Sequence, residues 1–357
     1  MSFEPEGEVH SRPPCAAILA LSDYQGASRM LRNTRFPVRV VASVALLLLT
    51  VARPTSGIAA PAAQEYRPVT IENCGVSTTY VQPPQRAVSM NQHTTEVMLA
   101  LGLEDSMIGT AYIDDEILPE LAQAYASVPV LAAEYPSKEV LINAGPDFIY
   151  GGFASAFAEP DLFTRAELDQ FGTASYLTTA ACLNGRPISM DDIYTDILNI
   201  GRIFGVEARA TRLVGEMQSG IDDVLGKIPE ANRQTRVMLY DSETDAPFVA
   251  ACCGAGGLAI GAAGGINIFD DLPGGWQNAN WEAVVSRNPD VVVLVQADWS
   301  SAQEKAAYLL STPSLGTVNA VHNVRFVTVP FTSTSPGIRV PALVRQLAVA
   351  LYPEYFE

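Results

Sequence analysis

The sequence predicts an α/β fold in which two halves of similar construction each contain a parallel sheet and are joined by a helical segment. Three observations support this prediction. Short apolar runs alternate with helical stretches in both halves, which is typical of parallel sheets covered by helices. The segment between the halves has helical periodicity, and one sequence pattern occurs once in each half.

The first half supplies four apolar strands with helical stretches between them. The periodicity predicts, in chain order, a strand at Ala87–Met90, a helix at Thr94–Leu101, a strand at Ile108–Thr110, a strand at Val128–Leu131, a helix at Glu139–Asn143 and a strand at Phe148–Tyr150.

The middle of the chain is helical from Ser189 to Lys227. Its apolar residues recur every three or four positions, as they do along the buried face of a helix. Gly205 interrupts this periodicity and is expected to divide the segment into two helices.

The second half resumes the alternation beyond Pro229. Its all-apolar runs predict strands at Val237–Tyr240, Val291–Val295 and Phe326–Val329. The chain therefore divides into an N-terminal extension at 1–62, an N-terminal α/β lobe at 63–188, a helical bridge at 189–229 and a C-terminal α/β lobe at 230–357.

A repeated sequence pattern relates the two halves. The segment SKEVLINAGPDFIYGG starts at Ser137, and the segment NWEAVVSRNPDVVVLVQ starts at Asn280. In both, a Glu in the first turn of a short helix is followed seven residues later by Pro-Asp and then by a buried strand. This repetition predicts two lobes built from matched units.

The composition is that of a folded, strongly acidic protein. Of the 357 residues, 48% are hydrophobic and 17% are charged, so disorder is excluded as the main state. The net charge is −17, and it becomes −19 without residues 1–62. Because binding to phosphate backbones depends on clustered basic side chains, nucleic acid is not expected as a partner.

The N-terminal extension has the order of a secretory signal. Arginines follow Met30, a second candidate start after Met1, and precede the apolar run Val40–Val51 and small residues at 56–62. A membrane anchor is the alternative, but the run is shorter than the roughly 20 residues that span a bilayer. We therefore expect export with cleavage of the signal, and no lipid anchor because no cysteine closely follows the run.

Four cysteines follow the signal, which an oxidising compartment allows to form disulfides. A bond between Cys74 and Cys182 is favoured. The alternative is that some cysteines remain buried thiols, because the adjacent Cys252 and Cys253 can pair only through a strained geometry.

From about Arg67 to its end, the chain resembles the periplasmic solute-binding proteins of ABC importers for ferric siderophores, haem and cobalamin. Three segments carry the resemblance: RAVSMNQHTTEVMLALGLEDSMIGTAY from Arg86, VPVLAAEYPSKEVLINAGPDFIY from Val128, and GGINIFDDLPGGWQNANWEAVVSRNPDVVVL in the second half. The resemblance implies two Rossmann-like lobes with parallel sheets, joined by a single long backbone helix, with the ligand between the lobes. Val206–Lys227 is the candidate for that helix.

The resemblance also implies how such a protein acts. It would be a monomeric receptor without catalytic activity, cofactor or resident metal, which carries a small-molecule ligand to an ABC permease in the membrane. One glutamate on each lobe docks onto the permease, and the motif transfers this role to Glu139 and Glu282. A Glu in a first helical turn is also stabilised by the helix dipole without any partner, so a purely structural role is the alternative.

Ligand contacts in α/β folds lie on the loops that follow the carboxyl ends of parallel strands. Trp276 also occupies the place where cobalamin binders of the family present a stacking aromatic. The expected ligand-binding residues are Asn91, Gln92, His93, Tyr112, Gly151, Gly152, Phe153, Asp241, Ser242, Trp276, Thr332, Ser333 and Thr334.

Metal ligation by the protein itself is not expected. After the signal only His93 and His322 remain, and neither has a recognisable ligand spacing. A polar or hydrogen-bonded role in the cleft is the more common one for a histidine such as His93. Arg339 could face an anionic chelate or lie in solvent on its helix.

Two other functions remain as alternatives. The run CGAGGLA around Gly254 follows a predicted strand at Phe248–Ala251 and opens an apolar helix, as a dinucleotide fingerprint does. A secreted nucleotide-dependent oxidoreductase would use this loop. However, no acidic residue closes a second strand at the required distance. The other alternative is a surface scaffold with a vestigial cleft.

Overall fold

The computed structural model describes residues 66–158, 160–183 and 185–356. The predicted signal segment lies outside these residues. Contacts divide the chain into one unit at Met1–Ala62 and another at Ala63–Glu357, and the second contains both sheets of the predicted lobes. No helix in the described part of the chain is both long enough and apolar enough to cross a membrane.

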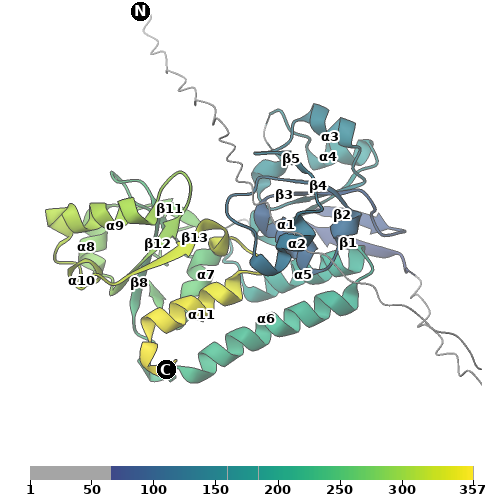
Figure 1. The fold of residues 1–357 in the computed structure, drawn as a ribbon. Helices are drawn as coiled ribbons and strands as arrows, with labels where there is room; N and C mark the ends of the chain where they lie inside the picture. Colours follow the sequence, from purple (N-terminus) through teal and green to yellow (C-terminus); the bar gives the residue numbers. More distant parts are fainter. Residues whose placement is uncertain (1–65, 159, 184, 357) are drawn as a thin grey trace, which may run out of the picture. The chain divides into compact units, whose positions relative to one another are not determined.

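The first half folds around a five-stranded sheet in which every pairing is parallel (Figure 1). Its strands, in spatial order, are β5 (Val130–Ala132), β4 (Met107–Ala111), β3 (Ala87–Met90), β6 (Phe148–Gly151) and β7 (Ala174–Leu177). Four predicted strands are therefore confirmed within two residues at each end. All four residues of β3 and of β6 are buried, as expected for inner strands covered on both faces.

Helices and a hairpin surround this sheet. An antiparallel hairpin of β1 (Val69–Asn73) and β2 (Val76–Tyr80), which the periodicity did not predict, precedes it. The helices of this half are α1 (Gln92–Ala100), α2 (Ala122–Tyr125), α3 (Lys138–Ala144) and α4 (Arg165–Gln170), with short 3-10 turns η1 (Glu104–Ser106), η2 (Pro119–Leu121), η3 (Ala154–Phe157) and η4 (Thr179–Cys182).

Two helices follow, as the sequence predicts. α5 (Met190–Ile203) and α6 (Glu207–Lys227) are separated at Gly205, whose φ of 68° is readily available only to glycine. The buried residues of α6 recur every three or four positions from Ala210 to Val224 and form one face. Figure 1 shows α6 beside α5 and beside α11 (Val340–Leu351), with which it also makes contact.

The second half contains a mixed six-stranded sheet. β8 (Arg236–Ser242), β12 (Val291–Gln296) and β13 (Phe326–Pro330) pair in parallel, and β10 (Ile266–Asn267) lies beside the first residues of β8. The parallel pairing expected for this half is present in these strands, and β9 (Phe248–Ala250) departs from it by returning from β8 as an antiparallel hairpin partner. β9 and β11 (Trp276–Asn278) are both antiparallel to their neighbours.

The remaining helices of this half are α7 (Ala255–Ala262), α8 (Trp281–Arg287), α9 (Ala302–Ser311) and α10 (Asn319–His322), with 3-10 turns η5 (Glu230–Asn232), η6 (Pro313–Leu315), η7 (Phe331–Thr334) and η8 (Pro353–Tyr355).

The repeated sequence pattern that starts at Ser137 and at Asn280 corresponds to two matched structural units. Ser137 caps α3 and Asn280 caps α8, each by accepting a hydrogen bond from a backbone N–H of the first turn. The Pro-Asp that follows also has one role in both units. Asp147 accepts hydrogen bonds from the backbone N–H groups of Gln85 and Arg86, and Asp290 accepts one from the N–H of Arg236. Each aspartate thus ties the strand that follows it to the start of the neighbouring strand, β3 or β8.

Candidate functional site

A cavity with a volume of about 860 Å³ lies between the two halves. The N-terminal half contributes Gly152, Phe153 and part of η4, which follow β6 and β7 at their carboxyl ends. The C-terminal half contributes the loop after β8, the loop before α7, and residues near Trp299 and η7. Carboxyl ends of parallel strands from both sheets therefore face one space, as in other open α/β folds.

Aromatic rings supply much of the apolar surface of this cavity. Trp276 stacks on Phe248, with ring centroids 5.8 Å apart and an interplanar angle of 20°. Trp299 meets Phe331 edge to face at 4.8 Å, and its side chain is 55% exposed. An exposed Trp on a cavity wall has contact surface available for a ligand.

The wall on the C-terminal side is acidic. Asp241 lines the cavity from the carboxyl end of β8, and Glu243 and Asp245 line it from the loop that follows. Asp241 is 5% exposed; its Oδ2 accepts a hydrogen bond from the Ser242 hydroxyl at 2.8 Å, and its Oδ1 has no partner among the described atoms. Burial raises the pKa of the Asp241 carboxyl, while the hydroxyl of Ser242 and the charge of Lys305 act in the opposite direction.

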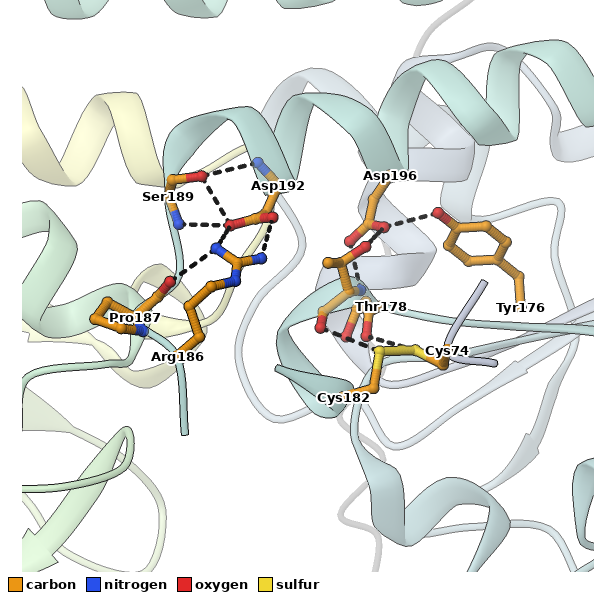
Figure 2. Close-up of polar contacts among 10 residues, drawn as sticks. Cys74, Tyr176, Thr178, Cys182, Arg186, Pro187, Ser189, Asp192 and Asp196 are labelled. Carbon is orange, nitrogen blue, oxygen red and sulfur yellow. Dashed lines mark hydrogen bonds and ion pairs between the residues drawn. A yellow bond between two sulfur atoms is a disulfide. The ribbon is translucent and has the colours of Figure 1, made fainter. Parts of the chain in front are cut away.

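The wall on the N-terminal side is held by a buried carboxylate and a disulfide (Figure 2). Ala180 and Ala181 of η4 line the cavity. Beneath them, Asp196 on α5 accepts hydrogen bonds from the hydroxyl of Tyr176 at 2.7 Å and from the backbone N–H of Thr179 at 2.8 Å. Burial raises the pKa of Asp196 to about 6 despite these hydrogen bonds.

The disulfide joins Cys74 to Cys182, the pair that the sequence favours, with 5.6 Å between the Cα atoms. It anchors the end of η4 to the turn between β1 and β2. Cys252 and Cys253 are bonded to each other in the structure, and Cys253 lines the cavity.

A smaller cavity of about 340 Å³ adjoins the first and shares Phe153, Trp299 and Phe331 with it. Asn91 and Tyr112 line it from the carboxyl ends of β3 and β4. Asp114 also lines it. Burial, and then the charges of the nearby Asp115 and Asp298, raise the pKa of Asp114 to about 6.

The structure brings many of the predicted ligand-binding residues to these cavities. Gly152, Phe153, Asp241, Ser242, Trp276 and Thr334 line the larger one, and Asn91, Tyr112 and Phe153 line the smaller one. The other predicted residues line neither cavity: Gln92, His93, Gly151, Thr332 and Ser333.

His93 lies beneath the cavity wall. It is 4% exposed, and a Cβ added to Gly152 would come within 2.4 Å of its ring. Burial lowers the pKa of His93 to about 4, so the imidazole is neutral at physiological pH. Its Nε2 has no partner among the described atoms.

Gln92 and Thr332 belong to a buried network between the halves. The Gln92 Oε1 accepts hydrogen bonds from the N–H of Asp115 and from the hydroxyl of Thr332. In the same network, Arg339 forms a two-pronged ion pair with Glu96, with Nε–Oε2 2.8 Å and Nη2–Oε1 2.5 Å. Arg339 therefore has neither of the roles considered from the sequence: it faces neither the cavity nor solvent.

The sequence interpretation missed Trp299 and Phe331. Trp299 follows β12 by three residues, so the same rule about carboxyl ends that selected Asp241 and Ser242 would have found it. Phe331 follows β13 directly and was overlooked in favour of the adjacent hydroxyl residues.

Glu139 and Glu282 are exposed in the first turns of α3 and α8. No hydrogen bond or ion pair involves either carboxylate within the described part of the chain. The N-caps of α3 and α8 are formed by Ser137 and Asn280, so capping does not require these glutamates.

The glycine-rich loop at Gly254 is not a dinucleotide fingerprint. That motif needs a parallel strand before the helix, whereas β9 is antiparallel to β8. The glycines allow close packing instead: a Cβ on Gly254 would lie 2.8 Å from the Cα of Gly275, and one on Gly257 would lie 2.4 Å from the carbonyl oxygen of Ala251.

Metal-binding clusters are absent from the described residues: no three His, Cys, Asp or Glu side chains lie close enough together to hold an ion.

Two known binding proteins are similar in sequence to this chain. An ABC transporter substrate-binding lipoprotein of Bacillus subtilis, itself uncharacterised, is 25% identical over 297 residues, which cover 82% of this chain and 88% of the relative. A cobalamin-binding protein of Halobacterium salinarum is 27% identical over 234 residues, which cover 62% of this chain and 57% of that protein.

The solved structure of a periplasmic binding protein from Veillonella parvula has a TM-score of 0.71 to this chain at 27% identity, and the match covers 79% of this chain and 97% of that one. The periplasmic binding protein family matches residues 88–332, a span that includes both sheets and the helices between them. The chain therefore belongs to the periplasmic binding protein family.

Proposed function

We propose that this protein is the exported substrate-binding component of an ABC importer and that it captures a ferric siderophore, a corrinoid or a haem-like ring between its two lobes. The observation that carries the proposal is the inter-lobe cavity, whose about 860 Å³ falls in the range of roughly 300–1,000 Å³ found for small-molecule sites. The similarity to a cobalamin-binding protein supports a ligand of this size and kind.

The cavity walls suit a large, partly apolar chelate. Trp276 and Trp299 offer ring surface on the C-terminal side, and Phe153 offers it on the N-terminal side. Such rings provide apolar contact area, while the few polar groups between them orient the ligand. Gly152, Asp241 and Thr334 are the polar contacts proposed for this purpose, and Asn91 and Tyr112 extend the site into the adjoining cavity.

Delivery requires a surface that the permease recognises. We assign it to Glu139 and Glu282, because they are exposed carboxylates at equivalent places in two matched units. Two such charges, one on each lobe, give a partner two separate points of attachment. In this proposal the protein acts as a monomer outside the cytoplasmic membrane and catalyses no reaction.

Ligand titration tests the capture step. Purified protein is titrated with cobinamide, haem and ferric hydroxamate, and binding is followed by quenching of tryptophan fluorescence. We expect at least one ligand to bind, and expect Trp276→Ala to weaken it, because Trp276 lines the cavity. Trp281→Phe is the matched control, since Trp281 lies on α8 and its indole N–H donates to the Thr244 carbonyl outside the cavity. If no ligand binds, or if both variants weaken binding equally, the proposed site is wrong.

A further inference from the structure

We propose that the cavity selects a chelate that has no net negative charge and that presents a hydrogen-bond donor to Asp241. This inference rests on the proposed function, because it assigns a charge class to the ligand of the same cavity. It separates ligands that the family alone does not separate. A corrinoid with amide side chains or a cationic ferric hydroxamate would be accepted, whereas haem with its propionates or a ferric catecholate would be disfavoured.

The charges on the cavity walls are all of one sign. Asp241, Glu243 and Asp245 line the larger cavity, and Asp114 lines the adjoining one. The described residues that line either cavity include no lysine, arginine or histidine. An anionic ligand would therefore lose hydration on entry and meet only negative charge, whereas a cationic ligand would be attracted.

Two basic side chains near this wall, Lys305 and Arg339, are already engaged. Lys305, the base whose charge acts on Asp241, is 3% exposed and donates hydrogen bonds to the carbonyl oxygens of Val295 and Ser300. Arg339 is 8% exposed and pairs with Glu96. Neither cation is presented to a ligand, so neither can pair with an anionic group there, although the charge of Lys305 partly offsets that of Asp241.

Asp241 also lacks a hydrogen bond that a ligand could supply. A carboxylate can accept about four hydrogen bonds, and among the described residues the Ser242 hydroxyl donates one to Oδ2, while the side chain of Trp299 also stabilises the charged carboxylate. Oδ1 is buried and has no partner there. Leaving a buried acceptor unpaired is unfavourable, so an N–H or O–H donor on the ligand would satisfy an atom that is already in place.

The aromatic rings favour the same ligands. The face of a tryptophan ring carries negative electrostatic potential, which attracts cations and the positive edges of amide groups. Trp276 and Trp299 therefore add to the preference that the carboxylates create.

Two matched pairs of probes test the inference in fluorescence titrations of the purified protein. The first pair is dicyanocobinamide and dicyanocobyrinic acid, which share one corrin ring but carry amides and carboxylates respectively. The second is a cationic ferric trihydroxamate and a trianionic ferric tricatecholate. In the pair that binds, we expect the amide or cationic member to bind at least about tenfold more tightly.

The variant Asp241→Asn should reduce this preference by roughly tenfold, since it removes the buried charge and keeps the shape of the side chain. Glu230→Gln is the control, because Glu230 is exposed on η5 and does not line the cavity; it should leave the preference unchanged. Equal or tighter binding of the anionic member, or an unchanged preference in folded Asp241→Asn, would overturn the charge inference and leave the proposed function standing. If neither member of either pair binds but haem does, the inference is overturned and the proposed function stands. If haem does not bind either, the proposed function fails and the inference fails with it.

Discussion

The guanidinium of Arg339 on the C-terminal side forms a buried ion pair with the carboxylate of Glu96 on the N-terminal side, 243 residues away in the chain. The two side chains are 8% and 0% exposed, so each charge depends on the other for compensation. Removing one partner leaves an uncompensated buried charge. We therefore expect Glu96→Ala to lower the free energy of unfolding by about 3–5 kcal/mol, measured by urea denaturation.

Two controls isolate the buried charge as the cause. Asp223→Asn breaks the exposed pair with Lys227 on α6 and should change stability little, because water screens that pair. The double variant Glu96→Leu with Arg339→Met should be markedly more stable than Glu96→Ala, since apolar side chains of similar size need no partner. A Glu96→Ala protein as stable as Asp223→Asn would contradict the buried-pair interpretation.

The disulfide between Cys74 and Cys182 closes a loop of 108 residues. A crosslink over such a long loop restricts the unfolded chain strongly, so the double variant Cys74→Ser, Cys182→Ser should lose about 2–5 kcal/mol of stability. Urea denaturation under oxidising conditions measures this loss.

The second cysteine pair provides a control within the same chain. Cys252 and Cys253 are adjacent, so their bond closes no loop of the chain. Replacing both by serine should leave the unfolding free energy nearly unchanged by the same reasoning. Equal losses in the two double variants would show that loop closure is not the source of stabilisation.

Asp196 and His93 are predicted to make opposite contributions to the pH dependence of stability. The pKa of Asp196 is raised to about 6, so the native state binds its proton more tightly than the unfolded chain does, and stability falls as pH rises from about 4 to about 6. The pKa of His93 is lowered to about 4, so stability rises with pH from about 4 to about 6.5.

Replacing either Asp196 or His93 should leave the contribution of the other residue to the pH dependence of stability. Asp196→Asn should make the unfolding free energy rise more steeply with pH in this window, whereas His93→Gln should make it rise less or fall. Urea denaturation at several pH values between 4 and 7 provides the measurement. Identical slopes in the two variants would show that these groups do not govern the acid range.

The parts of the fold that could be predicted from sequence are those set by local pattern. Runs such as Val291–Gln296 are apolar at nearly every position because both faces of their sheet are covered. The repeated Pro-Asp marks the passage from a short helix to a buried strand in both halves. The antiparallel pairing of β9 could not be predicted, because it depends on the hairpin after β8 and not on the apolar pattern of β9 itself.

The candidate site also has residues that the sequence could predict and residues that it could not. The rule for carboxyl ends of strands found Asp241 and Phe153, and it would also have found Trp299 had it been applied to β12. The pairing of Arg339 with Glu96 left no signal in the sequence, because the partners lie on helices of different halves and only the folded chain brings them together. The burial of His93 under Gly152 depends likewise on contacts between distant segments.

The docking role proposed for Glu139 and Glu282 predicts a variant that separates capture from delivery. Both side chains are exposed and neither lines a cavity, so Glu139→Ala with Glu282→Ala should leave stability and ligand affinity unchanged. Uptake of the ligand by cells that carry the cognate permease should fall to background, because both points of attachment to the permease are lost. The control removes two other exposed acids, with Glu216→Ala on α6 and Glu230→Ala on η5, and should preserve uptake. Normal uptake in the docking variant would mean that these glutamates serve only their helices, and equal loss in both variants would point to the net charge of the protein and not to specific docking.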